Sequence, residues 1–129
     1  MRILVADDSD SSRAAILDAM NQIFPEAEID AYADSTAAWE AARSREYDLI
    51  LTDADMPKMP GNELAEKIRS VYPHAEVFYV TGEEKFELEK LGIDIKRCIF
   101  KPYIVADIRR CLYENELFRF GSFGNELRL

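Results

Sequence analysis

Short apolar runs alternate along this chain with longer segments in which apolar residues recur at helical spacing. The apolar runs occupy residues 3–6, 27–31, 49–51, 77–80 and 98–100. In the second run, Ala27, Ile29 and Ala31 alternate with polar residues, which is typical of a half-exposed edge strand. The third and fourth runs are apolar throughout, as expected of strands that are covered on both faces.

A helical segment follows each apolar run. Residues 9–12 offer several N-cap side chains for the first helix, and Asp34 or Ser35 caps the second. The third helix stops before Pro73, the fourth covers 83–91, and the last runs from Ile104 towards Leu117. This alternating order predicts an α/β domain with a five-stranded parallel sheet and helices on both faces.

Composition and charge limit the function. The 129 residues, 48% of them hydrophobic, suit one compact domain. The chain has no apolar run of about 18 residues that could span a membrane, and its N-terminus has no signal-peptide pattern, so we expect a cytoplasmic protein.

A formal net charge of −9 argues against non-specific nucleic-acid binding by this segment. It suits a pocket for a divalent cation, although an acidic surface also simply keeps a domain soluble. Cys98, Cys111 and the single histidine, His74, do not form a zinc-binding pattern.

Candidate chemistry gathers at the ends of the expected strands, where ligands bind in open parallel sheets. The residues that follow the first, third, fourth and fifth strands are Asp7 and Asp8, Asp53 and Asp55, Thr81, and Lys101. Each alone has an ordinary interpretation as a helix cap, loop acid, turn residue or solvated lysine. Their shared placement at strand ends points instead to one site.

Clustered carboxylates repel one another unless a cation joins them, and Mg²⁺ prefers such oxygen ligands. With the metal bound, one carboxylate can attack phosphorus. Phosphoryl transfer depends mainly on neutralising charge on the transferred group, which Mg²⁺, the Lys101 ammonium and the Thr81 hydroxyl could provide.

Four motifs carry a resemblance to a known family. They are the pair Asp7-Asp8, the stretch 47–61 with Asp53, Met56-Pro57 and Gly61, the triplet Val80-Thr81-Gly82, and the run Phe100-Lys101-Pro102-Tyr103. With these motifs, residues 1–118 resemble the receiver domain of two-component response regulators. The resemblance implies a flavodoxin-like fold with strand order 2-1-3-4-5.

The resemblance also implies a role for each site residue. Asp53 would accept the phosphoryl group from a sensor histidine kinase or a phosphotransfer protein. Mg²⁺ would bind Asp53, Asp8, the backbone carbonyl of Asp55 and, largely through water, Asp7. Lys101 would pair with the phosphoryl group, Thr81 would move to report it, and Gly82 would leave room for it. Such a domain catalyses only its own phosphorylation and dephosphorylation and is not otherwise an enzyme.

At two positions, Cys98 and Asp55, the role of the side chain does not follow directly from the resemblance. Cys98 stands where the family usually has Tyr or Phe, and a thiol is too small to swing between two packed positions. We therefore predict that Cys98→Tyr alters partner binding and leaves phosphorylation intact. The side chain of Asp55 either tunes the lifetime of the phosphoryl group or is simply a solvated loop acid.

The partners follow from the same resemblance. A downstream protein would bind the face formed by the fourth helix, fifth strand and fifth helix. Residues 119–129 lie beyond the receiver pattern and could form a hairpin, support a homodimer, or open a linker to an output domain, which could bind DNA.

Two other classes of function stay open at this level. Asp53-Ala54-Asp55 has the Asp-x-Asp spacing of haloacid-dehalogenase-like phosphohydrolases, although in those enzymes the motif usually follows the first strand. A phosphorylation-independent interaction module that merely retains the site is the second alternative.

Overall fold

The computed structural model describes residues 1–115, which fold as a parallel sheet covered by helices on both faces. The elements in chain order are β1 (Arg2–Ala6), α1 (Asp10–Ile23), β2 (Glu28–Tyr32), α2 (Ser35–Ser44), β3 (Leu49–Thr52), α3 (Gly61–Val71), β4 (Glu76–Thr81), α4 (Lys85–Lys90), a 3₁₀ turn (Ile95–Arg97), β5 (Cys98–Phe100) and α5 (Val105–Glu114). The five strands pair in the order β2-β1-β3-β4-β5, which confirms the expected topology.

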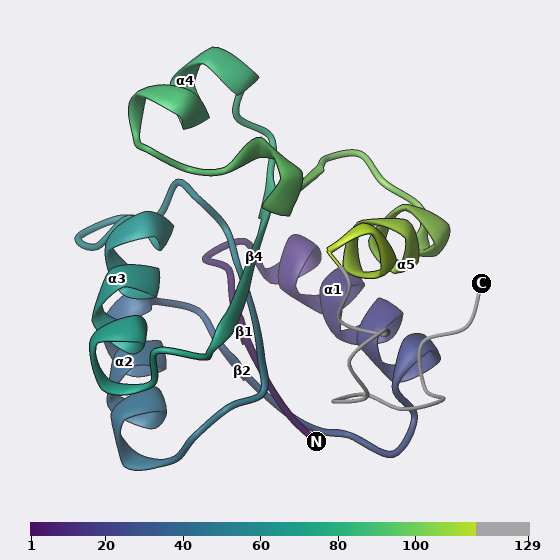
Figure 1. Ribbon diagram of the computed structural model, residues 1–129. Coiled ribbons are helices and arrows are strands. Elements are labelled where there is room, and N and C mark those ends of the chain that lie inside the picture. Colours follow the sequence, from purple (N-terminus) through teal and green to yellow (C-terminus); the bar gives the residue numbers. More distant parts are fainter. Residues whose placement is uncertain (116–129) are drawn as a thin grey trace.

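The alternation of side chains along the strands builds a separate core on each face. On one face, strand residues such as Ile3, Val5 and Leu51 pack against α1 and α5. On the other face, Leu4 and Ile50 belong to a second cluster with residues of α2, α3 and α4. Figure 1 shows α1 and α5 on one side of the strands and α2 and α3 on the other. Burial on both faces explains why β3 is apolar at nearly every position.

The helix boundaries largely follow the caps visible in the sequence. The Ser9 side chain accepts a hydrogen bond from the Ser12 N–H at 3.3 Å, and Asp34 accepts one from the Ala37 N–H at 2.8 Å. The fourth helix spans Lys85–Lys90 and is therefore shorter than the predicted 83–91. Neither end of α4 has a side-chain cap in the sequence that would have fixed it.

Hydrogen bonds continue past the strand ends and bring the site residues together. The Asp7 N–H donates to the Tyr32 carbonyl at 3.1 Å, and the Asp53 N–H donates to the Ala6 carbonyl at 2.9 Å. On the other side, the Lys101 N–H donates to the Thr81 carbonyl at 2.8 Å. The backbone is therefore fixed at the positions from which the polar side chains extend.

Within residues 1–115, no helix is both long and apolar enough to cross a bilayer. The last helix begins at Val105 and ends at Glu114, earlier than the expected extension towards Leu117. The expected boundary at residue 118 and the segment 119–129 lie outside the described residues.

Candidate functional site

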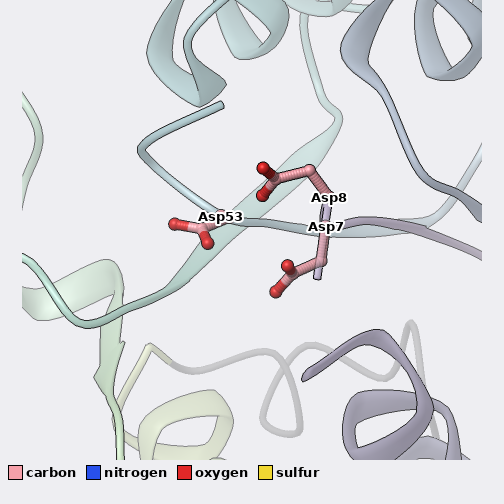
Figure 2. A group of neighbouring side chains, drawn as sticks. All are labelled: Asp7, Asp8 and Asp53. Atoms are coloured by element: carbon pink, nitrogen blue, oxygen red, sulfur yellow. The ribbon is translucent and has the colours of Figure 1, made fainter. Parts of the chain in front are cut away.

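Three carboxylates meet at the carboxyl ends of β1 and β3. Asp7 is fully buried, Asp53 is 9% exposed and Asp8 is exposed. One oxygen of each lies within 4.8 Å of the others, and Figure 2 shows the three side chains around the same space. The structure thus brings together three of the carboxylates that the sequence placed at strand ends.

The buried Asp7 carboxylate is held from several directions. Its Oδ1 accepts the Ser9 N–H at 2.9 Å, and its Oδ2 accepts the Ser12 hydroxyl at 2.7 Å. The Arg13 guanidinium donates to the Asp7 backbone carbonyl at 2.9 Å. Ser12 and Arg13 were not singled out from the sequence, where the polar run at 9–12 indicated only helix capping. Their place in the first turn of the helix that follows the strand end is the feature that could have identified them.

Asp53 is fixed by its own loop and by the start of α3. The Asp55 N–H donates to its Oδ1 at 3.1 Å. Gly61 packs so closely that a Cβ atom there would lie 2.1 Å from the Asp53 carbonyl oxygen. Burial raises the pKa of the Asp53 carboxyl above its usual value, and this effect outweighs the Asp55 N–H and the Lys101 ammonium, which both lower it. The ionised carboxylate is therefore costly here and gains from an added cation.

Lys101 connects the two buried carboxylates. Its Nζ lies 3.1 Å from Asp7 Oδ2 and 3.2 Å from Asp53 Oδ2. Burial alone would lower the pKa of this ammonium, but the two carboxylates together outweigh that effect and raise it. Lys101 thus stays charged at neutral pH and offsets part of the negative charge of the site.

Thr81 is buried at the end of β4, and its hydroxyl oxygen accepts the Glu83 N–H at 3.0 Å. Next to it, an added Cβ at Gly82 would find no atom within 4 Å, so there is space beside the threonine. The Asp55 side chain is exposed. Among the described residues, Asp7, Asp8, Asp53 and Lys101 are thus brought into one group, and Thr81 is in this structure bonded to the following loop.

The donor set fits Mg²⁺. Three carboxylates against one ammonium leave a net negative site, and all the candidate donors are oxygens. One oxygen of each carboxylate lies within 4.8 Å of the others, which is close enough for one bound cation to contact all three. Asp7, Asp8 and Asp53 could therefore hold the ion, directly or through water.

The chain matches the family model described as "response regulator receiver domain" over residues 3–113. It belongs to this family. A magnesium site is typical of receiver domains, and the sheet order and the acidic group described above agree with that assignment.

Comparisons with individual proteins agree with this family assignment. The chain is 28% identical to the sensor protein EvgS of Escherichia coli over 104 residues, which cover 79% of this chain but only 8% of that protein. It superposes on the chemotaxis response regulator CheY4 of Vibrio cholerae with a TM-score of 0.72 and 25% identity, covering 88% of this chain and 96% of the other.

A further structural neighbour is the receiver domain of the sensor histidine kinase PA1611 of Pseudomonas aeruginosa, solved with a magnesium ion in its active-site cleft. The TM-score is 0.76 at 20% identity, with 88% of this chain and 94% of that one covered. This likeness supports the fold.

Proposed function

We propose that this receiver domain accepts a phosphoryl group on Asp53 in a Mg²⁺-dependent reaction and thereby switches its affinity for a downstream partner. The observation that carries the proposal is the position of Lys101, whose ammonium pairs with both Asp7 and Asp53 beside the three-carboxylate group. A lysine held there is ready to pair with an anion added to Asp53.

The donor is a phosphohistidine on a sensor histidine kinase or phosphotransfer protein. An oxygen of the Asp53 carboxylate forms a bond to phosphorus as the phosphorus–nitrogen bond breaks, and the imidazole leaves and takes up a proton. Asp7, Asp8, Asp53 and the Asp55 carbonyl would hold Mg²⁺, which would supply positive charge for the transferred oxygens. Lys101, which follows β5 at the same edge of the sheet, adds a second positive charge. Hydrolysis of the acyl phosphate later returns the free carboxylate.

The switch begins at Thr81. Its hydroxyl now accepts the Glu83 N–H, and it can rotate to donate to a phosphoryl oxygen on Asp53 instead. Such a rotation frees the start of the loop that leads into α4. Phosphorylation then biases a two-state equilibrium of that loop and helix.

The partner surface is the face of α4, β5 and α5. Apolar side chains are exposed along it, with Phe86 of α4 and Ile104 at the start of α5 each 67% exposed. Exposed apolar groups of this size favour a protein contact over open solvent.

The test is intact-mass analysis after incubation with acetyl phosphate, with and without Mg²⁺, on the wild type and Asp53→Asn. One phosphoryl adduct that requires both Mg²⁺ and Asp53 is expected. A kinase or phosphotransfer donor replaces acetyl phosphate where the small molecule gives no adduct. Absence of an adduct with every donor would reject the proposal.

Two further results would point to the alternatives. Partner binding that is unchanged in Asp53→Asn would favour a phosphorylation-independent interaction module. Steady turnover of a phosphate ester, abolished by the same substitution, would favour a phosphohydrolase.

A further inference from the structure

A cavity lies next to the proposed phosphorylation site. It has a volume of about 280 Å³ and lies between the loop that follows β3 and the helix α4. Its lining is mainly apolar, with Ala54 and Pro60 from the loop and Leu91 from the end of α4. The Leu91 side chain is 46% exposed, so apolar surface continues from the cavity to the outside. The proposed function uses the Asp55 carbonyl and the surface of α4, but it assigns no ligand to the cavity itself.

The charged groups around this apolar lining are mostly acidic. Asp55, Glu83 and Glu87 come from three different segments, and Lys90 is the ammonium among the described lining residues. Lys90 Nζ lies 3.6 Å from Glu87, but both side chains are more than half exposed, so this ion pair is weak. A cavity with an apolar lining and net negative rim complements a ligand with an apolar stem and a cationic head.

Size and charge together favour one kind of ligand. The volume lies just below the range of roughly 300–1,000 Å³ that is usual for small-molecule pockets, so it suits one long side chain. A guanidinium can pair with more than one carboxylate at once and is less strongly hydrated than an ammonium. The arginine side chain of a partner protein meets both conditions, with the rest of the partner resting near Leu91.

Two hydrogen bonds connect the cavity to the phosphorylation site. The backbone N–H of Glu83 donates to the Thr81 hydroxyl at 3.0 Å, and the backbone N–H of Asp55 donates to Asp53 Oδ1 at 3.1 Å. Two of the three acidic residues at the cavity are therefore held by groups that change when Asp53 is phosphorylated. Rotation of Thr81 breaks the first bond and releases Glu83 from its present place.

We propose that this cavity binds an arginine side chain of a partner protein and that it does so preferentially in the unphosphorylated state. The state preference rests on the proposed function above. The cavity is formed while Thr81 is bonded to Glu83, so loss of that bond removes one carboxylate from the rim. By linkage, a bound arginine opposes phosphorylation by the same free energy with which phosphorylation opposes its binding.

The binding half is tested by NMR titration of the ¹⁵N-labelled protein with the peptide acetyl-Gly-Arg-Gly-amide. The matched ligand is the same peptide with citrulline, which keeps the shape and removes the charge. Saturable shifts at the amides of Ala54, Glu83 and Leu91 are expected with arginine at millimolar concentration and not with citrulline. Equal shifts with both peptides, or no saturable shift, would overturn the proposal.

A matched pair of variants separates the cavity from the acidic surface as a whole. Glu87 lines the cavity, while Glu89 is an exposed acid on the same helix that does not. Glu87→Gln should weaken arginine-peptide binding about two- to fivefold, as for loss of a solvent-exposed ion pair, and Glu89→Gln should leave it unchanged. Equal weakening by both variants would show general attraction to a negative chain and reject the site.

The state preference is tested by repeating the titration on protein loaded with Mg²⁺ and beryllium trifluoride, a stable mimic of the phosphoryl group. Binding of the arginine peptide should weaken by about fivefold or more. Unchanged or tighter binding, with the mimic bound at Asp53, would overturn the coupling alone. Failure of the mimic to bind would instead reject the proposed function, and with it the coupling between phosphorylation and arginine binding. The arginine site itself is judged by the titration of the unphosphorylated protein.

Discussion

The close approach of Gly61 to Asp53 offers a sharp test of how the site is built. Gly61 is the first residue of α3, and its N–H donates to the Ala54 carbonyl at 3.0 Å. In an open environment, replacing a helical glycine with alanine stabilises a protein by about 0.5–1 kcal/mol. Here the new methyl group would lie 2.1 Å from the Asp53 carbonyl oxygen and 3.1 Å from the Ala54 Cα, so backbone must move.

The expected change in stability of Gly61→Ala combines the cost of the clash with the gain in helix propensity. Overpacking typically costs about 1–3 kcal/mol, and a contact this short against rigid backbone belongs at the upper end. After subtracting the helix-propensity gain, Gly61→Ala should lose about 2 kcal/mol of stability, or about 8 °C in melting temperature at roughly 4 °C per kcal/mol. The matched control is Gly82→Ala, because nothing lies within 4 Å of an added Cβ and its φ is not left-handed. That variant should keep its stability or gain about 0.4–1 kcal/mol.

Urea unfolding followed by circular dichroism measures both variants, and intact-mass analysis follows their phosphorylation. Because the clash pushes on the Asp53 backbone, Gly61→Ala should also phosphorylate at least about tenfold more slowly. If Gly61→Ala is as stable as the wild type and is phosphorylated at the same rate, the reasoning that Gly61 sets the position of Asp53 is wrong.

Three further substitutions test the charge balance and the switch. Without Mg²⁺, Asp53→Asn should raise the free energy of unfolding at neutral pH, because burial raises the pKa of Asp53 and makes its ionised form costly. In urea unfolding across pH, this gain should disappear as the pH falls towards 3.8, the ordinary pKa of the carboxyl, where Asp53 is protonated in the folded protein. A gain that persisted in acid would have another cause. Lys101→Met should slow phosphorylation, as measured by intact mass. It should also lower the free energy of unfolding in urea by about 1–3 kcal/mol, since it leaves two buried carboxylates without their shared cation. Wild-type stability would argue against that pairing. Cys98→Tyr should keep phosphorylation, change partner binding in a pull-down or calorimetric assay, and cost about 1–3 kcal/mol by overpacking a position that is 8% exposed; loss of phosphorylation would refute the separation of the two.

The fold was predictable because its signals are local and repeated. Apolar runs such as 49–51 and 77–80 became β3 and β4, and the alternating run near Ile29 became the edge strand β2. The short 3₁₀ turn at Ile95–Arg97 was not predicted, since three residues are too few for a periodic pattern. The ends of α4 were missed for a similar reason, because its sequence has no side-chain cap.

The site was predictable only in part. The strand ends predicted that Asp7, Asp53 and Lys101 lie at the same edge of the sheet. Because β4 separates β5 from β3, the pairing of Lys101 with both carboxylates depends on the reach of the lysine side chain past the end of β4. The contacts of Ser12 with Asp7 and of Gly61 with Asp53 depend on how a helix enters its strand end, which sequence spacing alone does not specify. Their importance appears only when distances between backbone atoms are known.

The position of Cys98 bears on how a change at Thr81 can reach a partner. Cys98 pairs in register with Tyr79 of β4, belongs to the core cluster next to α3 and α4, and is 8% exposed. Burial raises the pKa of its thiol to about 12, so this side chain is neutral and has no charge to respond to phosphorylation. A small, neutral, packed group transmits little by rotating. The hydrogen bond between Thr81 and Glu83 connects the threonine directly to the loop before α4, so in this receiver domain we expect that loop to carry the signal to the partner surface.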